Sequence, residues 1–205
     1  MKGVIVIGNN LSPELAKHEC AGSYVIGADK GALYCYKNQI PMDVAVGDFD
    51  SLSEKEKENV LSYAKNSVIL NPVKDDTDTA HALSLLKDCD EVTILGGIAG
   101  RRIEHFLAIL DLLAADTRIS LKDDDSSIQV LGPGEYELEK GVYRFFSFFA
   151  LEDSIVTLDG FAYPLNCYLL KRFDPLGVSN QMQREKAHVK IEKGKLLFVS
   201  SRSDS

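Results

Sequence analysis

The sequence lacks any long hydrophobic run. No stretch of its 205 residues approaches the ~20 consecutive apolar residues that a membrane-spanning helix needs. The apolar start, Val4–Ile7, is too short for the hydrophobic region of a signal peptide and soon gives way to polar residues. We therefore expect no membrane segment and interpret Val4–Ile7 as a buried first strand.

Paired cysteines are also missing. The four cysteines, Cys20, Cys35, Cys89 and Cys167, form no C-x-x-C pair and show no spacing typical of a metal site. Isolated cysteines are usually small buried hydrophobic residues, and free thiols persist in a reducing compartment. This pattern predicts a cytoplasmic protein.

Positive charge is scarce. The chain has 23 Lys and Arg against 31 Asp and Glu, a formal net charge of -8. Nucleic-acid binding depends on a basic surface, so no nucleic-acid partner is expected. Apolar residues make up 45% of the sequence, enough for a core in one ordinary domain or two small ones.

The first ~120 residues alternate between strand-like and helix-like patterns. Ser12-Pro13-Glu14 and the capping box Ser53–Glu56 are typical of helix starts. Such alternation predicts βαβ units and a mostly parallel sheet. The predicted strands are Val4–Ile7, Tyr24–Ala28, Val44–Val46, Ser67–Leu70 and Glu91–Leu95, and apolar residues at helical spacing predict an amphipathic helix over Arg102–Ala115.

The pattern changes after the acidic run Lys122–Asp125, which we interpret as a solvated loop at a domain boundary. Gly132-Pro133-Gly134 is a strong turn signal, and residues 135–139 alternate polar and apolar as a half-buried strand does. Many short strands in ~80 residues favour a small antiparallel sandwich or barrel. The sequence thus predicts an α/β domain over residues 1–122 and a smaller β domain over residues 126–205.

Polar and glycine-rich segments follow the predicted strands of the first half. In open α/β sheets this carboxyl edge is where ligands bind. The aspartates expected there are Asp29, Asp48, Asp50, Asp75 and Asp78.

The segment Gly47–Ser51 is the sharpest candidate for a metal site. Clustered carboxylates repel one another unless a cation neutralises them, and magnesium prefers oxygen ligands. Asp48 and Asp50 would point to opposite sides of an extended backbone, but a tight turn at Gly47 could direct both to one ion. An exposed acidic turn, with Asp78 or a neighbouring Thr serving only as a helix N-cap, explains these residues as well.

The segment Gly96–Arg102 has the composition of a phosphate-binding turn. Glycines permit close backbone approach, a following helix N-terminus favours anions, and Arg can hold phosphate oxygens in bidentate fashion. Lys74 is either a phosphate ligand or an ion-pair partner of the nearby acids. No G-x-x-x-x-G-K-[ST] sequence occurs, which excludes a P-loop enzyme.

Taken together, these motifs resemble those of thiamin pyrophosphokinases. A-D-x-G-A from Ala28, G-D-F-D-S from Gly47, K-D-x-T-D from Lys74 and G-x-x-G-R-R-I-E-H from Gly97 resemble the family pattern A-D-G-G-A, G-D-x-D-S, K-D-x-T-D and G-G-R-x-D-H in order. Residues 160–165 and 177–180 look like the family's G-x-x-Y-P-L and G-x-S-N segments, so the resemblance covers nearly the whole chain.

The resemblance implies transfer of the pyrophosphoryl group of ATP to the hydroxyl of thiamin, which gives thiamin diphosphate and AMP and requires Mg²⁺. It also implies an α/β nucleotide domain, a C-terminal β-sandwich and a homodimer whose active sites lie between the nucleotide domain of one subunit and the sandwich of the other. A magnesium-dependent phosphohydrolase and a non-catalytic nucleotide or thiamin sensor stay open as alternatives.

The resemblance assigns roles to single residues. Asp48, Asp50 and Asp78 match the family's magnesium ligands, and either Asp29 or Asp48 accepts the hydroxyl proton. Matches to residues beside the phosphates or the thiamin pocket are Lys74, Asp75, Arg102, Tyr163, Ser179 and Asn180.

Three positions depart from the family pattern. Lys30 and Arg101 replace glycines, and Arg101 thereby offers an extra phosphate contact, whereas Glu104 replaces an aspartate. None of these changes removes a predicted magnesium ligand. Because the chain has no tryptophan, stacking on thiamin is left to Tyr or Phe.

Overall fold

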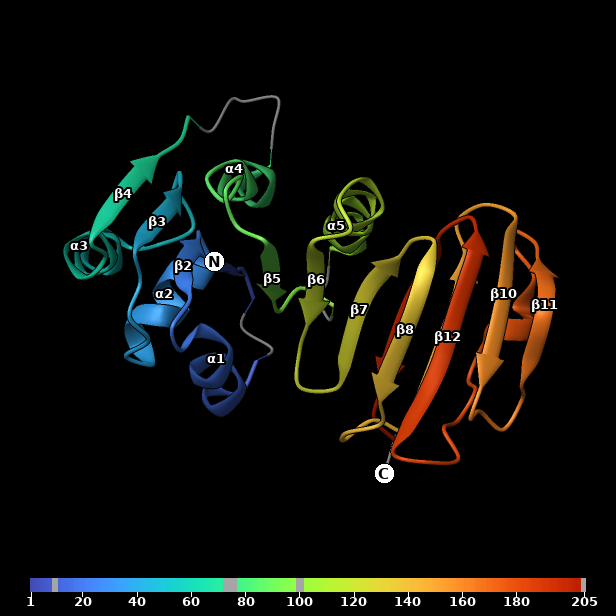
Figure 1. Ribbon diagram of the computed structural model, residues 1–205. Helices are drawn as coiled ribbons and strands as arrows, with labels where there is room; N and C mark the ends of the chain where they lie inside the picture. The colour runs from blue at the N-terminus through green and yellow to red at the C-terminus, as the bar shows by residue number, and fades with distance from the viewer. Residues whose placement is uncertain (9–10, 72–76, 99–101, 204–205) are drawn as a thin grey trace. The chain divides into compact units, whose positions relative to one another are not determined.

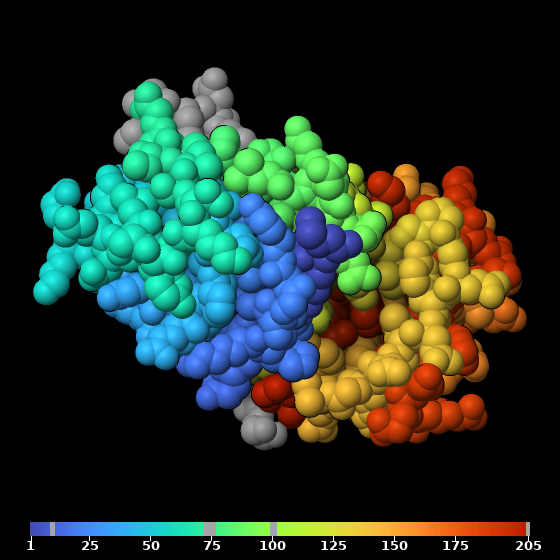
Figure 2. All heavy atoms as spheres, turned by 60° about the vertical axis from the view of Figure 1, so that its left-hand side comes forward, coloured from blue at the N-terminus to red at the C-terminus, as the bar shows by residue number. Residues whose placement is uncertain are grey.

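The computed structural model describes residues 1–8, 11–71, 77–98 and 102–203. They form two compact units, one made of Met1–Leu112 with Leu121–Asp124 and the other of Leu113–Ser120 with Asp125–Ser205 (Figure 1). Figure 2 colours the first unit mainly blue to green and the second mainly yellow to red. Within the described residues, no helix has both the length and the apolar character needed to cross a bilayer.

The first unit is built on a parallel sheet, as predicted. Its strands run in the order β4-β3-β2-β1-β5, and every neighbouring pair among these five is parallel. The chain fills the sheet outward from β1 to β4 and then returns to the other side of β1, so the strand order reverses between β1 and β5. The strands are β1 (Lys2–Val6), β2 (Tyr24–Ala28), β3 (Val44–Gly47), β4 (Asn66–Ile69) and β5 (Glu91–Leu95).

Hydroxyl caps start three helices of this unit. Ser12 accepts a hydrogen bond from Leu15 N–H at the start of α1, and Ser53 forms the predicted capping box with Glu56 at the start of α3. Thr77 accepts from Ala80 N–H at the start of α4. The helices are α1 (Pro13–Cys20), α2 (Lys30–Lys37), α3 (Glu54–Tyr63), α4 (Asp78–Ser84) and α5 (Ile103–Ala115).

The predicted helix α5 is present, but only part of its apolar pattern, which included Ile103, Leu107 and Leu113, is buried. Ile109 and Leu113, one turn apart, are buried at 3% and 0% exposure. Ile103 and Leu107, which helped to define the pattern, are 61% and 54% exposed. Apolar residues surround most of this helix, so spacing alone did not identify the packed face.

The acidic run is not the solvated loop that the sequence predicted. Asp123 is only 6% exposed. Asp124 accepts from the backbone N–H of Ser12 at 2.7 Å and from its hydroxyl at 2.6 Å. Two of the acids therefore belong to the packed part of the first unit, and one of them holds the start of α1.

The strands of the second unit pair antiparallel in two sets, ordered β7-β13-β9 and β11-β10-β12-β8, and the second set is a separate four-stranded sheet. Side chains from both sheets share one core that includes Phe146, Phe148, Val156 and Val189. This arrangement is the predicted β-sandwich. Its strands are β7 (Ser126–Leu131), β8 (Gly134–Glu139), β9 (Phe145–Ala150), β10 (Ser154–Asp159), β11 (Leu165–Leu170), β12 (Lys186–Lys193) and β13 (Leu196–Ser201); β6 (Ile119–Lys122) precedes them, and a short 3-10 helix, η1 (Pro175–Gly177), lies between β11 and β12.

Candidate active site

Three predicted site residues of the first unit stand at the ends of its secondary-structure elements. Asp29 separates β2 from α2, Asp48 directly follows β3, and Asp78 is the first residue of α4. The carboxyl ends of parallel strands share one edge of a sheet. Asp29 and Asp48 follow two neighbouring strands, β2 and β3, and therefore lie beside each other at that edge.

Asp29 has an unusual backbone conformation. Its φ is 49° and its ψ is -114°, a region that residues with a Cβ rarely adopt. The backbone is held on both sides, because Asp29 N–H donates to Val46 O at 2.8 Å and Ala32 N–H donates to Asp29 O at 3.0 Å. Gly47 makes room for it, since a Cβ at that position would lie 3.2 Å from the Asp29 Cα. Strain of this kind costs roughly 1–3 kcal/mol and is common at functional sites.

The carboxyl group of Asp29 is only partly satisfied. Its Oδ2 accepts from the Ser51 hydroxyl at 3.3 Å. Its Oδ1 is buried and has no hydrogen-bond partner among the residues that the structure describes. A buried carboxylate oxygen without a donor is costly, which marks this atom as the place for a cation or a proton.

Three other carboxylates act on Asp29 at this edge. Burial is the main cause that raises the pKa of Asp29, and the negative charges of Asp78, Asp48 and Asp50 raise it further. The hydrogen bond from Ser51 acts in the opposite direction. The structure thus brings together the acids that the sequence identified separately.

The segment between Asp48 and Asp50 forms a tight turn. Asp48 Oδ1 accepts from Asp50 N–H at 3.1 Å, and Phe49 has a left-handed φ of 57°. The Phe49 ring is 1% exposed and anchors the turn in the core. The backbone is therefore not extended here, which removes the objection that two carboxylates two positions apart must face opposite sides.

Hydroxyl side chains, and not the neighbouring aspartates, cap α3 and α4. The structure assigns that role to Ser53 in α3 and to Thr77 in α4, each through a hydroxyl that accepts a backbone N–H. Asp50 lies before the first cap, and Asp78 lies after the second. Of the two N-cap candidates for α4, the structure therefore selects the neighbouring Thr77 and not Asp78.

These residues fit a magnesium ion that is shared with a phosphate ligand. Within the described parts of the chain, no three His, Cys, Asp or Glu side chains form a ready-made metal cage. Mg²⁺ does not require one, because it usually takes one or two carboxylates together with substrate phosphates and water. The oxygen-only donor set of Asp48, Asp50 and Asp78 suits this mode of binding, and the unpartnered Oδ1 of Asp29 is left to receive a proton.

Glycines bring the ends of β1 and β5 into close approach. Gly96 and Gly97 have φ values of 84° and 90°, which favour glycine. A Cβ on Gly8 would lie 2.8 Å from Gly97 N, and one on Gly96 would lie 2.8 Å from Gly8 Cα. This close approach lies where the strand order reverses, the usual place for a ligand in an open α/β sheet.

Arg102 lies after this turn and forms an ion pair with Glu104, the residue that replaces the family's aspartate. Its Nε–H donates to Glu104 Oε1 at 2.7 Å, and this bond holds the pKa of Glu104 below its ordinary value. The longer acid therefore keeps Arg102 in an exposed ion pair at the start of α5. Three other predicted site residues, Lys74, Asp75 and Arg101, lie outside the described residues.

Two contacts at the acidic turn were not predicted. Ser51 belongs to the Gly47–Ser51 motif, but its hydrogen bond to Asp29 depends on the packing of β3 beside β2. Lys57 Nζ–H donates to Asp48 O at 3.5 Å from the second turn of α3. The position of Ser51 immediately after Asp50 is the only sequence signal that could have identified it.

In the second unit, the three residues predicted for the thiamin pocket lie close together. Tyr163 is 67% exposed, whereas Asn180 is 2% exposed and hydrogen-bonds to the Tyr163 backbone. Ser179 precedes Asn180 with a left-handed φ of 57°, and its N–H donates to Ser147 Oγ at 2.9 Å.

Both halves of the chain match known protein families. The family described as "Thiamin pyrophosphokinase, catalytic domain" matches residues 16–122, and "Thiamin pyrophosphokinase, vitamin B1 binding domain" matches residues 135–196. The chain belongs to the thiamin pyrophosphokinase family. The thiamine pyrophosphokinase of Bacillus subtilis (strain 168) is 33% identical over 94% of each chain.

Solved structures of this family have the same fold. A crystal structure of thiamine pyrophosphokinase from Bacillus subtilis superposes with a TM-score of 0.88 at 32% identity and covers 99% of this chain and 100% of the other. A thiamin pyrophosphokinase family protein from Enterococcus faecalis superposes with a TM-score of 0.87 at 28% identity, with all of both chains covered.

Proposed function

We propose that this protein is a thiamin pyrophosphokinase, which transfers the pyrophosphoryl group of ATP to the hydroxyl of thiamin and releases AMP. The observation that carries the proposal is the group of four carboxylates that Asp29 forms with Asp48, Asp50 and Asp78, in a chain whose residues 16–122 and 135–196 match this family. Residues 1–122 would bind ATP and Mg²⁺, and residues 126–205 would bind thiamin. The enzyme would act in the cytoplasm as a homodimer.

The nucleotide-binding residues come from the first unit. Asp48, Asp50 and Asp78 would hold Mg²⁺, which when bound offsets negative charge on the phosphate oxygens. Arg102 would exchange its exposed bond to Glu104 for phosphate oxygens, which match the planar guanidinium better. The other candidates for phosphate binding are Lys74, Asp75 and Arg101.

Asp29 would accept the proton of the thiamin hydroxyl. The hydroxyl oxygen bonds to the β-phosphorus while the bond from that phosphorus to the oxygen of the departing AMP breaks, and the proton passes to the carboxylate. A raised pKa brings this group closer to the ideal for a general base. Asp48 is the weaker of the two candidates, because its Oδ1 already accepts from Asp50 N–H.

The thiamin-binding residues come from the second unit. Tyr163 is an exposed aromatic residue and is the candidate for stacking on thiamin in a chain without tryptophan. Ser179 and Asn180 would form the adjoining wall. Neither a phosphohydrolase nor a sensor is favoured by any feature of the structure, and a sensor has little need for clustered carboxylates.

The decisive assay measures AMP formed from ATP and Mg²⁺ with thiamin added or withheld. We expect AMP and thiamin diphosphate in equal amounts, and only when thiamin and Mg²⁺ are both present. Release of inorganic phosphate without thiamin would instead support a phosphohydrolase. Tight thiamin binding in calorimetry without turnover would support a sensor.

A further inference from the structure

The side chain of Asn180 makes three hydrogen bonds to backbone groups. Its Oδ1 accepts from Tyr163 N–H at 3.0 Å and from Gln181 N–H at 2.9 Å. Its Nδ2–H donates to Tyr163 O at 2.7 Å. The partners also determine the orientation of the amide, because a backbone carbonyl can only accept and a backbone N–H can only donate.

This bonding leaves Asn180 little capacity for a ligand. Both lone pairs of Oδ1 are used, and one Nδ2–H remains on a residue that is 2% exposed. A ligand that took the place of either backbone partner would leave a buried polar group unpaired, which is costly. The geometry therefore disfavours direct contact between Asn180 and thiamin.

The amide instead holds the backbone of Tyr163 on both sides. It binds the N–H and the C=O of that residue as a neighbouring strand would, and Tyr163 as a whole stays 67% exposed. The flanking backbone is paired too, because Ala162 N–H donates to Gln181 O and Gln183 N–H donates to Gly160 O.

Strand β9 anchors Asn180 from the opposite side. The backbone groups of Asn180 and Phe146 exchange two hydrogen bonds, at 2.8 and 3.0 Å. Ser147 Oγ accepts from Ser179 N–H at 2.9 Å. A Cβ on Gly177 would lie 2.2 Å from Phe148 O, so this segment packs directly on the strand. Asn180 thus connects the core of the sandwich to the Tyr163 turn.

We propose that Asn180 is a positioning residue, which fixes the Tyr163 backbone so that its ring is preorganised for the thiamin ring without itself touching the substrate. The inference rests on the proposed function, and it assigns to Asn180 a role different from the pocket contact that the resemblance implies. Preorganisation favours binding because less ordering remains to be done when the ligand arrives.

The first test compares the steady-state kinetics of Asn180→Ala, Asn180→Asp and Tyr163→Ala. We expect each to raise the KM for thiamin roughly tenfold with little change in kcat or in the KM for ATP, as for the loss of ground-state binding. Asn180→Asp keeps the size and the acceptor but loses the donor, so it reports on the bond to Tyr163 O if Asn180→Ala folds poorly. Gln183→Ala, an exposed amide on the same segment, is the matched control.

The double variant Asn180→Ala/Tyr163→Ala separates positioning from contact. If Asn180 acts through Tyr163, the KM of the double variant for thiamin stays within about twofold of the KM of Tyr163→Ala. A KM for thiamin that rises in the double variant by the product of the two single-variant increases would overturn the proposal.

Amide exchange gives a readout that does not depend on activity. In protein labelled with ¹⁵N-tyrosine, Tyr163→Phe identifies the signal of residue 163 among the eight tyrosines. We expect this amide to exchange at least about tenfold faster in Asn180→Ala, and unchanged exchange would contradict the positioning role. A wild type that forms no AMP with thiamin would overturn the proposed function and this inference together, whereas an active wild type with independent effects overturns the inference alone.

Discussion

Asp29 combines a strained backbone, a buried oxygen without a described partner, and three neighbouring negative charges. Each of these features lowers stability, and folding retains them because the surrounding hydrogen bonds to Val46 and Ala32 hold the backbone in place. A magnesium ion or a transferred proton would relieve the charge. The cost to stability and the proposed chemistry therefore have the same origin.

The magnesium ligands can be tested by single substitutions. We expect Asp50→Ala and Asp78→Ala each to lower thiamin-dependent AMP formation at least about 100-fold, because one oxygen ligand of the ion is lost. The matched control is Asp88→Ala, an exposed aspartate that precedes β5 and so lies toward the opposite edge of the sheet. Full activity in either Asp50→Ala or Asp78→Ala would refute the metal assignment.

The proton acceptor can be tested with Asp29→Asn. Asn tolerates a positive φ better than most residues but cannot accept the proton, so kcat should fall about 10²- to 10⁴-fold. Binding of ATP with Mg²⁺, measured by calorimetry, should survive. Near-normal kcat would transfer the role of base to Asp48.

Asp29→Gly tests the strain directly. Glycine adopts φ 49° and ψ -114° without penalty, so the variant should gain about 1 kcal/mol in free energy of unfolding while it loses activity. Chemical denaturation measures this gain. A less stable Asp29→Gly protein would mean that the aspartate backbone is not strained.

Single residues also show what a linear pattern can predict at a site. The acids were identified because strand ends are visible in the sequence and because several motifs follow one another in the family's order, whereas D-x-D alone is a common pattern. The positive φ of Asp29, and the Ser51 hydrogen bond that accompanies it, depend on β2 and β3 lying side by side. No local pattern encodes such a contact between segments 22 residues apart.

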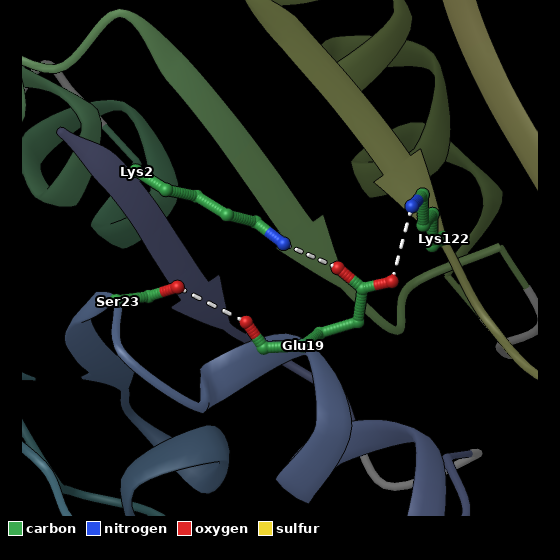
Figure 3. Close-up of polar contacts among 4 residues, drawn as sticks. All are labelled: Lys2, Glu19, Ser23 and Lys122. Carbon is green, nitrogen blue, oxygen red and sulfur yellow. Dashed lines mark hydrogen bonds and ion pairs between the residues drawn. The ribbon is translucent and has the colours of Figure 1, made fainter.

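At the scale of elements, α1 is fastened by charge as well as by apolar packing. Glu19 on this helix accepts from Lys2 Nζ of β1 at 2.6 Å and from Lys122 Nζ of β6 at 3.1 Å (Figure 3). Burial alone raises the pKa of Glu19, but the two lysines outweigh burial and hold its pKa below the ordinary value. The backbone carbonyl of Glu19 also accepts from the Ser23 hydroxyl (Figure 3).

Removal of this charge should destabilise the first unit. We expect Glu19→Gln to lower the free energy of unfolding at pH 7 by about 2 kcal/mol, because two charged hydrogen bonds are weakened at a residue that is 7% exposed. Glu14→Gln, an exposed acid on the same helix, should change it by less than about 0.5 kcal/mol. Urea denaturation of the three proteins measures both effects.

We also expect the stability difference between wild type and Glu19→Gln to depend on pH. A lowered folded-state pKa means that Glu19 contributes stability above its ordinary pKa of 4.5 and loses that contribution as the pH falls through the folded value. The stability difference between wild type and Glu19→Gln should therefore be constant near neutral pH and shrink below about pH 4.5. A difference that grew on acidification would contradict the assigned direction.

Elements were predictable where the sequence carries local signals. Capping residues placed the start of α3, and apolar runs placed the parallel strands. The packed face of α5 and the burial of Asp123 were not predictable, because each depends on which distant segment covers the residue. An acidic run resembles a solvated loop until a partner such as Ser12 is placed beside it.

At the scale of the whole molecule, the proposal is a homodimer, which the family resemblance implies. We expect sedimentation velocity to give twice the mass of one chain at micromolar concentration. If the active site needs both subunits, specific activity should fall on dilution into the range where the dimer dissociates, and it should recover on concentration. A monomer with constant specific activity would refute this arrangement.

The sequence by itself determined the fold class, the order of the motifs and the family. These properties depend on periodicity, capping and short motifs, which are local in the chain. Tertiary structure decided the strand order, the state of the Asp29 carboxyl and the pairing of Asn180 with Tyr163. Each of these depends on contacts between distant segments, and the energy of a buried polar group is set by the partner that folding places beside it.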